Sequence, residues 1–352
     1  MEAFWNNIRK VTPYTPGEQP KTENVIKLNT NENPYPPSPK VTEALESIGR
    51  LRMYPDPAAS ELVGAIADYK GLKKEQVFVG VGSDDVLAMC FLTFFNGKLP
   101  ILFPDITYSF YDVWAELFQV PYELQKLKKD FSIDPEDYKK KNGGIIFPNP
   151  NAPTGVDMGL SKIEEILQEN PDVIVIVDEA YVDFGCESAV SLLEKYPNLL
   201  VVQTFSKSRS LAGLRIGYAM GSSALIKALN DVKYSFNSYT MNQPSIVLGK
   251  AAIADEAYFQ DTRRKIMETR EWFKGEMKKL DFHFPDSKAN FIFASHERIP
   301  ASQIFEAARR ENIYVRYFNK PGIDNYLRIT IGTHSEMESF LTFLRTFIGK
   351  TV

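Results

Sequence analysis

The feature that most constrains the fold is an apolar run, Val173-Ile174-Val175-Ile176-Val177, in which every residue is β-branched. A strand with one face in water alternates apolar and polar residues, whereas a strand that is apolar throughout belongs inside a sheet covered on both faces. The run from Leu199 to Val202 follows the same pattern. Together the two runs predict a central, mostly parallel sheet sandwiched by helices.

Strand-like and helical segments alternate from about residue 40 to about residue 250, which is typical of an α/β domain. We expect the helix at 161–169 to begin with Ser161 as its N-cap, because a serine side chain can accept a hydrogen bond from the first helical turn. The other strands of this part are expected at residues 77–82, 101–103 and 144–147, and the other helices at residues 84–92 and 111–117.

The two ends of the chain differ from this central part. The first residues are rich in proline, which predicts an extended arm, and Phe4, Trp5 and Tyr14 suggest that the arm docks on something. After about residue 255, a long charged helix (258–280) precedes short strands that suit a smaller α+β domain. Those strands are expected at residues 290–294, 313–316 and 326–330. We therefore expect an N-terminal arm, a large domain and a small C-terminal domain, at residues 1–35, 36–254 and 255–352.

Composition and charge argue against several classes of protein. The net charge is −4, the pI is about 5.7 and no basic block stands out, so we expect no nucleic-acid partner. No apolar run approaches the roughly 20 residues that cross a bilayer, so we expect no membrane contact. The two cysteines lie far apart and the three histidines form no zinc motif, which predicts a reduced, cytoplasmic protein without a metal.

Two ionisable residues follow the buried strands, at the edge of the sheet where open α/β proteins bind ligands. Lysine is seldom buried, so Lys207 is either a residue of a surface loop or an amine that bonds a carbonyl compound as a Schiff base. Asp178 directly follows Val177. It is either a helix N-cap or an acid that keeps a cationic group, such as a pyridine nitrogen, protonated.

Three other segments after strands carry polar or aromatic residues. Gly82-Ser83-Asp84 can approach a phosphate at a helix N-terminus or form a plain tight turn, and the dinucleotide fingerprint is absent because position 85 is Asp. Tyr108 can stack on a flat ring or lie in the core. Asn151 lies in a turn bounded by prolines, whose polar side chains can face a ligand or only stabilise the turn.

Two arginines, Arg215 and Arg328, are candidates for binding a carboxylate or phosphate through two parallel hydrogen bonds. Each candidate is ambiguous alone. Together they supply an amine, an acid, a phosphate cradle, a stacking ring and anion-binding groups at strand ends or in loops. This is the set of groups that pyridoxal 5′-phosphate needs, and we expect it as the cofactor.

Motifs along nearly the whole chain resemble those of the fold-type I, class II pyridoxal-phosphate-dependent aminotransferases. They lie at Thr12 to Tyr14, Leu28 to Pro34, Arg52 to Asp56, Asp178 to Tyr181, Thr204 to Gly217 and Leu327 to Gly332. The resemblance implies a large domain with a mostly parallel sheet, a smaller α+β domain and an extended arm. It is greatest to members that transfer an amino group between histidinol phosphate and 2-oxoglutarate, giving imidazole-acetol phosphate and glutamate in histidine biosynthesis.

The resemblance also implies roles for individual residues. Lys207 bonds the cofactor, Asp178 pairs with its pyridine nitrogen, and Tyr181 donates a hydrogen bond to its phenolic oxygen. The residues implied to bind the cofactor are Tyr54, Gly82, Ser83, Asp84, Tyr108, Asn151, Asp178, Tyr181, Thr204, Ser206, Lys207 and Arg215. The residues implied to bind substrate are Tyr14, Asn31, Arg316 and Arg328. Tyr54 reaches the cofactor of a neighbouring subunit, which implies a homodimer with shared active sites.

One position departs from the family pattern. The family has an asparagine directly before its Pro-Thr-Gly motif, where it donates to the phenolic oxygen, and this chain has Ala152 there. The preceding Asn151 is the candidate that replaces this donor. The cofactor residues alone leave other activities open: an aromatic amino acid aminotransferase, a decarboxylase of a phosphorylated amino acid, and a non-catalytic cofactor-binding module.

Overall fold

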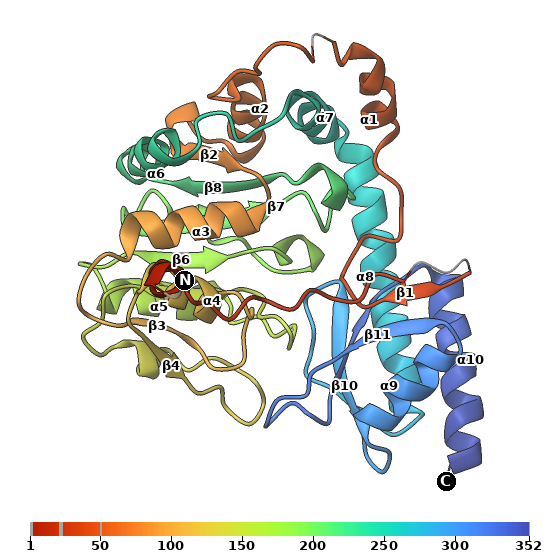
Figure 1. The fold of residues 1–352 in the computed structure, drawn as a ribbon. Coiled ribbons are helices and arrows are strands. Elements are labelled where there is room, and N and C mark those ends of the chain that lie inside the picture. The colour runs from red at the N-terminus through yellow and green to blue at the C-terminus, as the bar shows by residue number, and fades with distance from the viewer. Residues whose placement is uncertain (1–2, 21–23, 50, 352) are drawn as a thin grey trace.

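The computed structural model of the chain describes residues 3–20, 24–49 and 51–351 and contains two sheets, each with its own helices (Figure 1). Within these residues, the larger sheet has the strand order β2-β8-β7-β6-β5-β3-β4 and the smaller sheet the order β1-β11-β12-β10-β9. The helices are α1 (Pro39–Ala44), α2 (Ser60–Lys70), α3 (Ser83–Phe94), α4 (Tyr111–Phe118), α5 (Leu160–Glu169), α6 (Ser223–Phe236), α7 (Gln243–Ile253), α8 (Glu256–Lys278), α9 (Ala301–Arg310) and α10 (His334–Thr351). The strands are β1 (Ile26–Leu28), β2 (Val77–Gly80), β3 (Ile101–Pro104), β4 (Tyr122–Gln125), β5 (Ile145–Pro148), β6 (Val175–Asp178), β7 (Leu199–Thr204), β8 (Gly217–Gly221), β9 (Phe282–His283), β10 (Phe291–His296), β11 (Ile313–Tyr317) and β12 (Leu327–Thr330).

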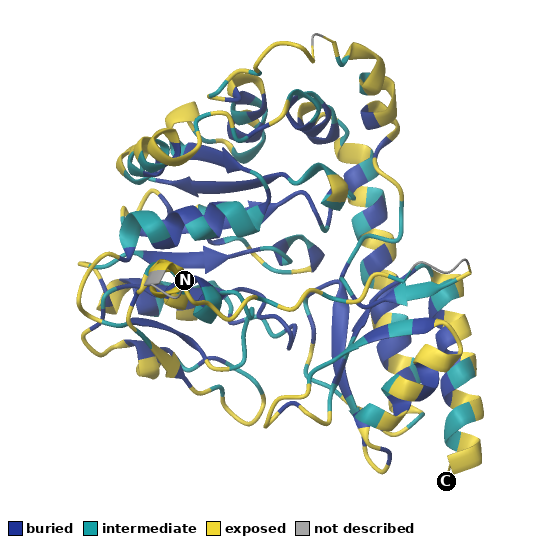
Figure 2. Ribbon diagram, in the orientation of Figure 1, coloured by how far each residue is buried: buried dark blue, intermediate teal, exposed yellow. Residues whose placement is uncertain are grey.

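The larger sheet is parallel except at β8, which runs antiparallel to its neighbours β2 and β7. On the central strand β6, Val175 and Val177 pack in the core beneath α2, α5 and α7, while Ile176 packs in the core beneath α3, α4 and α6. Both faces of the sheet are therefore buried (Figure 2). This burial explains why the strand is apolar at every position, and it confirms the predicted α/β architecture.

The smaller sheet packs against α8, α9 and α10 around its own apolar core. Most of its strands pair antiparallel, but β1 runs parallel to β11, with Ile26 opposite Ile313. The first segment of the chain therefore supplies an edge strand to a sheet that is otherwise built from the C-terminal part. Directly after β1, residues 29–33 lead the chain from this sheet toward the larger one.

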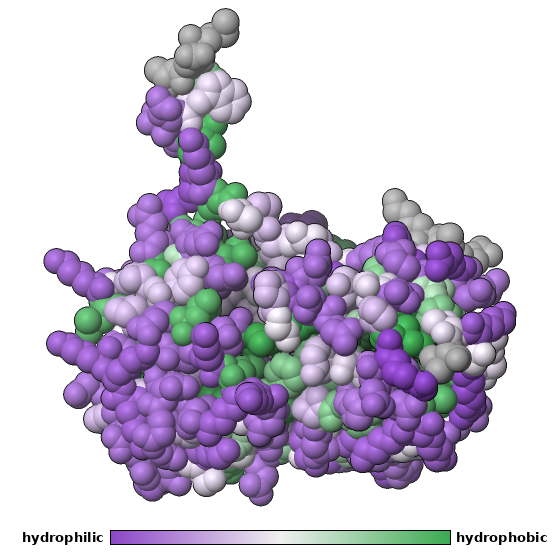
Figure 3. All heavy atoms as spheres, turned by 90° about the horizontal axis from the view of Figure 1, so that it is seen from below, coloured by the Kyte–Doolittle hydropathy of each residue, from purple (hydrophilic) through white to green (hydrophobic). Residues whose placement is uncertain are grey.

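The beginning of the arm projects from the body of the molecule (Figure 3). Tyr14 stacks on Phe110 of the body, with ring centroids 4.2 Å apart. Phe4 and Trp5, in contrast, are 56% and 59% exposed. The arm thus docks on the larger part of the chain at Tyr14 and leaves its first aromatic residues in solvent.

The structure differs from the sequence-based expectations at several elements. Helix α5 begins at Leu160, so Ser161 lies inside the first turn and Gly159, with a φ of 80°, occupies the N-cap position instead. The sequence pattern predicts no strand in the arm, where β1 lies. It also misses β4 and β8. β4 is an edge strand in which polar residues, Glu123 and Gln125, alternate with Tyr122 and Leu124, and β8 begins and ends with glycine, so neither shows the apolar run of a central strand.

Candidate active site

A cavity of about 210 Å³ opens at the carboxyl ends of β5, β6 and β7. Its walls come from the larger sheet, from residues 29–32 after β1, and from β11 and β12 of the smaller sheet. The candidate residues that line it are Tyr14, Asn31, Ser83, Asp84, Tyr108, Asp178, Tyr181, Thr204, Ser206, Lys207, Arg215, Arg316 and Arg328. Residues distant in the sequence thus meet around one cavity that lies between the two sheets.

Lys207 reaches this cavity from the turn after β7 and is half-buried. Its Nζ donates a hydrogen bond to the backbone carbonyl of Thr30, 3.1 Å away, and lies 5.8 Å from the centre of the Tyr181 ring. Among the described residues no carboxylate lies within ion-pair distance of this amine. A backbone carbonyl is a weaker partner than a carboxylate, so the amine is held in place and remains available for bond formation.

Asp178 ends β6 and is only 4% exposed. Its carboxylate accepts hydrogen bonds from the Tyr111 hydroxyl at 2.9 Å and from the Ala180 backbone N–H at 3.2 Å. No described lysine or arginine pairs with it, and burial raises its pKa to about 6. A cationic group in the cavity would stabilise the ionised form of this carboxylate, which is what a protonated pyridine nitrogen supplies.

Tyr181 follows the same strand and is fixed from two sides. Its hydroxyl accepts a hydrogen bond from Asn31 Nδ2 at 2.9 Å, and its ring packs edge-on against Phe291 at 5.0 Å. Asn31 is itself buried, and its backbone N–H donates to the Thr330 hydroxyl at 3.0 Å. Segments from the N-terminal arm and the smaller sheet therefore both contribute to the orientation of one phenol of the larger domain.

At the other end of the cavity, α3 begins at Ser83, so its first backbone N–H groups face the site. Gly82 has a φ of 87°, and a Cβ on it would lie 2.5 Å from Arg215 Nη2, so the approach of this arginine requires glycine. Thr204 and Ser206 add hydroxyls, which hydrogen-bond each other at 3.0 Å. A helix N-terminus, two hydroxyls and an arginine form an anion-binding site.

Two further side chains flank this anion site. The Tyr108 hydroxyl donates to Asp84 Oδ1 at 2.7 Å, and burial raises the pKa of that hydroxyl well above its ordinary value, so it stays protonated. Arg215 Nη2 lies 3.2 Å from Asp84 Oδ2. Asp84 therefore holds both the aromatic ring and the arginine at the mouth of the cradle.

The smaller sheet supplies a second cationic region, at Arg316 and Arg328. Arg328 Nη2 donates to the carbonyl of Asn29 at 2.9 Å, but its buried Nε has no hydrogen-bond partner among the described residues. A buried guanidinium N–H without a partner is unfavourable. Burial also lowers the pKa of Arg328. An anionic ligand would satisfy this donor, so the region suits a carboxylate or a phosphate.

Three candidate residues are not part of the lining. The Asn151 side chain donates to the Ile106 carbonyl at 2.9 Å and accepts from the Thr107 hydroxyl at 3.2 Å, and Ala152 faces the cavity instead. Gly82 lies directly behind Ser83 and shapes the cradle. Tyr54 is 82% exposed and packs against the ring of Tyr239 at 4.7 Å, outside this cavity.

The lining also includes residues to which the sequence analysis gives no binding role. They are Gly17, Asn29, Thr30, Glu32, Pro148, Ala152, Ala180 and Ala212. Thr30 contributes its backbone carbonyl, which has no side-chain signal. Glu32 pairs with Lys27 at 2.5 Å, and in the sequence these two residues look like any surface ion pair. The one signal that points to Thr30 and Glu32 is their position in the motif from Leu28 to Pro34, beside Asn31.

The donor set fits pyridoxal phosphate. The cavity holds an amine at Lys207, an uncompensated buried acid at Asp178, a phenol at Tyr181 and an anion cradle around Arg215. The unpartnered Nε of Arg328 is a further anion donor at the smaller sheet. No group of residues that could hold a metal ion, and no helix long and apolar enough to cross a bilayer, occurs in the described part of the chain.

Comparisons with known proteins agree with this geometry. The family described as "Aminotransferase class I and II" matches residues 23–344. A histidinol-phosphate aminotransferase of Clostridium acetobutylicum is 54% identical over 352 residues, which is 99% of this chain and 100% of that protein. A putative histidinol-phosphate aminotransferase of Erwinia carotovora atroseptica has the same fold, with a TM-score of 0.87 and 23% identity over 96% of this chain and 99% of that one. A histidinol-phosphate aminotransferase of Sinorhizobium meliloti, solved in complex with pyridoxal-5′-phosphate, has a TM-score of 0.84 and 20% identity over 93% and 91%.

Proposed function

Because this chain belongs to the class I and II aminotransferases, we propose that it transfers an amino group between histidinol phosphate and 2-oxoglutarate in histidine biosynthesis. The products are imidazole-acetol phosphate and glutamate. The observation that carries the proposal is the cavity in which the Lys207 amine, the buried Asp178 carboxylate and the unpartnered Nε of Arg328 meet. Lys207 and Asp178 serve the chemistry of the amino group, and Arg328 binds the anionic part of a substrate.

Pyridoxal phosphate is the cofactor, and when bound it supplies an electron sink for the carbon next to the reacting amine. We assign its phosphate to the cradle of Ser83, Thr204, Ser206 and Arg215, and its covalent attachment to Lys207 Nζ. Asp178 would keep the pyridine nitrogen protonated, Tyr181 would donate to the phenolic oxygen and Tyr108 would stack on the ring.

Lys207 would have a second task, as the group that moves a proton during the transfer. Its Nζ, held near the Thr30 carbonyl, would take the proton from the substrate carbon that carries the amino group. The same amine would then deliver that proton to the cofactor carbon to which the amino group has been bonded.

Arg328 binds the carboxylate of glutamate or the phosphate of histidinol phosphate, with Arg316, Tyr14 and Asn31 beside it. We expect Arg328→Lys to lower kcat/KM for glutamate by about 10²-fold, mainly through KM, because an ammonium cannot make two parallel hydrogen bonds. Steady-state kinetics and a cofactor absorbance spectrum measure the two effects separately. The exposed Arg345, which pairs with Glu276 at 2.8 Å, offers a matched Arg→Lys control. Loss of cofactor without a KM effect would contradict this role.

The substrate is tested by paired assays on the purified holoenzyme. We expect histidinol phosphate with 2-oxoglutarate to give the highest kcat/KM, because the cofactor phosphate occupies the cradle at Arg215 and the second cationic region, at Arg316 and Arg328, remains for the doubly charged phosphate of the substrate. A higher value with phenylalanine or tyrosine would make the protein an aromatic amino acid aminotransferase. Release of carbon dioxide from a phosphorylated amino acid without a 2-oxo acid would make it a decarboxylase.

The protein acts on small molecules, and we further propose that it works as a homodimer with shared sites. Tyr54 is 82% exposed and lies outside its own cavity, so it is free to reach the cofactor phosphate of a second copy. If it does, mixing inactive Lys207→Ala with impaired Tyr54→Ala chains should restore activity, since one of the two sites in each mixed dimer is then intact. Size-exclusion chromatography verifies that the mixed species is a dimer. A mixture no more active than its parts would argue against shared sites.

We also propose that residues 36–254 and 255–352 form separate domains, because each sheet has its own apolar core. We propose in addition that the protein is located in the cytoplasm. This location is supported by Cys90 and Cys186, which are both free thiols, as is usual for proteins of that compartment.

A further inference from the structure

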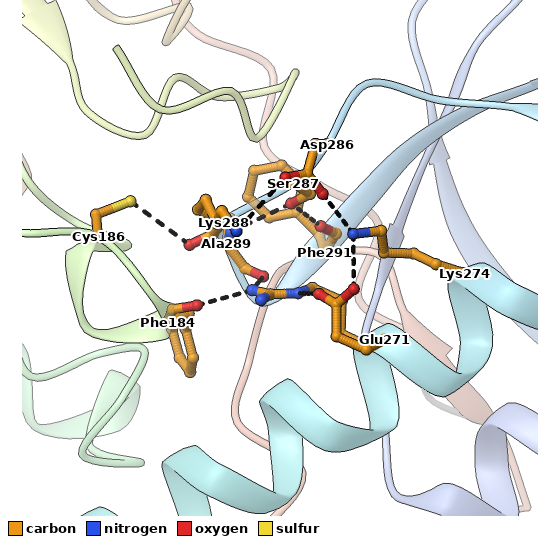
Figure 4. Close-up of polar contacts among 10 residues, drawn as sticks. Phe184, Cys186, Glu271, Lys274, Asp286, Ser287, Lys288, Ala289 and Phe291 are labelled. Atoms are coloured by element: carbon orange, nitrogen blue, oxygen red, sulfur yellow. Dashed lines mark hydrogen bonds and ion pairs between the residues drawn. The ribbon is translucent and has the colours of Figure 1, made fainter. Parts of the chain in front are cut away.

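Arg270 lies on α8 with only 3% of its surface exposed, at the junction between the two sheets. A buried guanidinium is tolerated only when its donors are satisfied. Its Nε lies 2.9 Å from Glu271 Oε1, and Lys274 Nζ donates to the other oxygen of that carboxylate at 2.8 Å. The charge of Arg270 is thus compensated on its own helix. Figure 4 labels the residues of this network, with Glu271 and Lys274 on α8 and with Phe184 and Ala289 on two other segments.

These donors tie together two backbone segments from different parts of the chain. Arg270 Nη1 donates to the carbonyl of Phe184 at 2.8 Å and to the carbonyl of Ala289 at 2.9 Å. Phe184 belongs to the turn that follows Tyr181. Ala289 belongs to the segment 286–291, which leads into β10 of the smaller sheet. One side chain therefore fixes the segment after Tyr181 relative to the smaller sheet.

The segment 286–291 is held at several other points. Lys274 Nζ donates to Asp286 Oδ1 at 2.5 Å, and Ser287 Oγ donates to the Phe291 carbonyl at 2.5 Å. The Lys288 backbone N–H donates to the carbonyl of Gly155, 2.8 Å away. Gly155 has a φ of 77°, and a Cβ on it would clash with Ser287. The segment thus fits closely against the loop that carries Ala152.

The same segment makes the surface on which Tyr181 rests. Ala289 and Phe291 pack with Ala152 in a small apolar cluster against the Tyr181 ring. Between them, Asn290 Nδ2 donates to the carbonyl of Asn31 at 3.0 Å, and Asn31 Nδ2 donates to the Tyr181 hydroxyl at 2.9 Å. Both the ring and the hydroxyl of Tyr181 therefore depend on where the segment 286–291 lies.

We propose that Arg270 is a positioning residue for Tyr181, which it orients through the segment 286–291. The proposal rests on the proposed cofactor role of Tyr181. Alanine at position 152 cannot donate a hydrogen bond, and the Asn151 side chain is bonded to Ile106 and Thr107. The Tyr181 hydroxyl is therefore the side-chain donor that we assign to the phenolic oxygen of the cofactor. A small rotation of Tyr181 would weaken that single hydrogen bond, and Arg270 prevents the rotation from a position that touches neither cofactor nor substrate.

The test is the pH dependence of the absorbance of bound cofactor, which needs no substrate. A donor to the phenolic oxygen favours the deprotonated chromophore, so a misplaced Tyr181 raises the pH midpoint of the spectral change. We expect Arg270→Met to raise this midpoint by about one pH unit and Arg270→Lys, which keeps the charge, by less. Arg264→Met is the matched control, since Arg264 is exposed on the same helix and pairs with Asp261 and Glu268.

A double-mutant cycle separates positioning from other effects. In a Tyr181→Phe background, Arg270→Met should cause no further shift of the midpoint, because the hydroxyl that it orients is gone. An equal shift in both backgrounds would indicate a long-range effect of the lost charge and would overturn the proposal, as would an unshifted midpoint in a folded Arg270→Met protein. If Arg270→Met does not fold, the same double-mutant cycle is carried out with Arg270→Lys and Tyr181→Phe. A wild-type protein that does not bind pyridoxal phosphate would overturn the proposed function as well, whereas a different preferred substrate would leave this inference intact.

Discussion

Replacing Lys207 with alanine is expected to lower the turnover of transamination by about 10⁴-fold while pyridoxal phosphate still binds. The amine has two tasks, bonding the cofactor and moving the proton at the substrate carbon, and alanine performs neither. Binding should persist because the cradle around Ser83 and Arg215 and the Asp178 carboxylate do not involve Lys207.

The loss is measured by single-turnover amino transfer from glutamate, and retention of the cofactor by equilibrium dialysis. Borohydride treatment should fix the cofactor to the wild-type protein and leave it removable from the variant. Lys195→Ala is the control, because the side chain of Lys195 is 62% exposed and pairs with Glu164 on the surface. Robust turnover by Lys207→Ala would refute the assignment of the catalytic amine.

Asp178→Asn is expected to lower kcat/KM by roughly 10²- to 10³-fold, because the amide cannot keep the pyridine nitrogen protonated.

The same substitution should raise the free energy of unfolding of the apoprotein and lower that of the protein with cofactor bound. Burial raises the pKa of Asp178 to about 6, above its ordinary value of 3.8, so in the apoprotein the folded state holds this proton more tightly than the unfolded state. Stability from this group is therefore present below about pH 4 and is lost as the pH rises through 6.

The asparagine does not titrate, so apo Asp178→Asn should be more stable than the apo wild type at pH 8, by roughly 1 to 3 kcal/mol, and equal to it near pH 4. Asparagine can still accept the hydrogen bond of Tyr111. The adjacent Glu179, whose pKa burial raises to about 7, is present in both variants and cancels. With cofactor bound, the order at pH 8 should reverse, because the wild-type carboxylate then has a cationic partner.

Urea unfolding of both variants across the pH range, with and without pyridoxal phosphate, measures this difference. An apo variant that is less stable than the wild type at pH 8 would mean that the carboxylate is compensated by a group within the protein. A cofactor that stabilises both variants equally would mean that Asp178 does not contact the pyridine nitrogen.

The central fold could be read from the sequence because its signal is local. The apolar run at β6 and the run at β7 show double-sided burial directly, and the residues after them, Asp178 and Lys207, line the cavity. The same logic fails for β8, which runs antiparallel between glycines, and for β1, a three-residue strand whose partner β11 lies near the other end of the chain. The strand β11 is expected from its own residues, at 313–316, but nothing in those residues indicates that it pairs with β1.

The site was less predictable where it depends on backbone atoms or distant contacts. The Thr30 carbonyl that holds Lys207 has no side-chain signal, and the orientation of Asn151 depends on hydrogen bonds to Ile106 and Thr107 that no turn pattern specifies. Arg270 appears in the sequence as one charge among many on a long helix. Its burial follows only from the packing of that helix between the two sheets.

The pairing of β1 with β11 has a consequence for the order in which the molecule is made. Residues 29–32, which bring Asn31 to Tyr181 and the Thr30 carbonyl to Lys207, follow a strand that has no partner until β11 has left the ribosome. The larger sheet can form earlier, since all its strands precede β9 in the chain. A nascent chain stalled before β11 would therefore hold a folded larger sheet with an incomplete cavity. Catalysis would begin only after β1, near the start of the chain, had paired with β11, near its end.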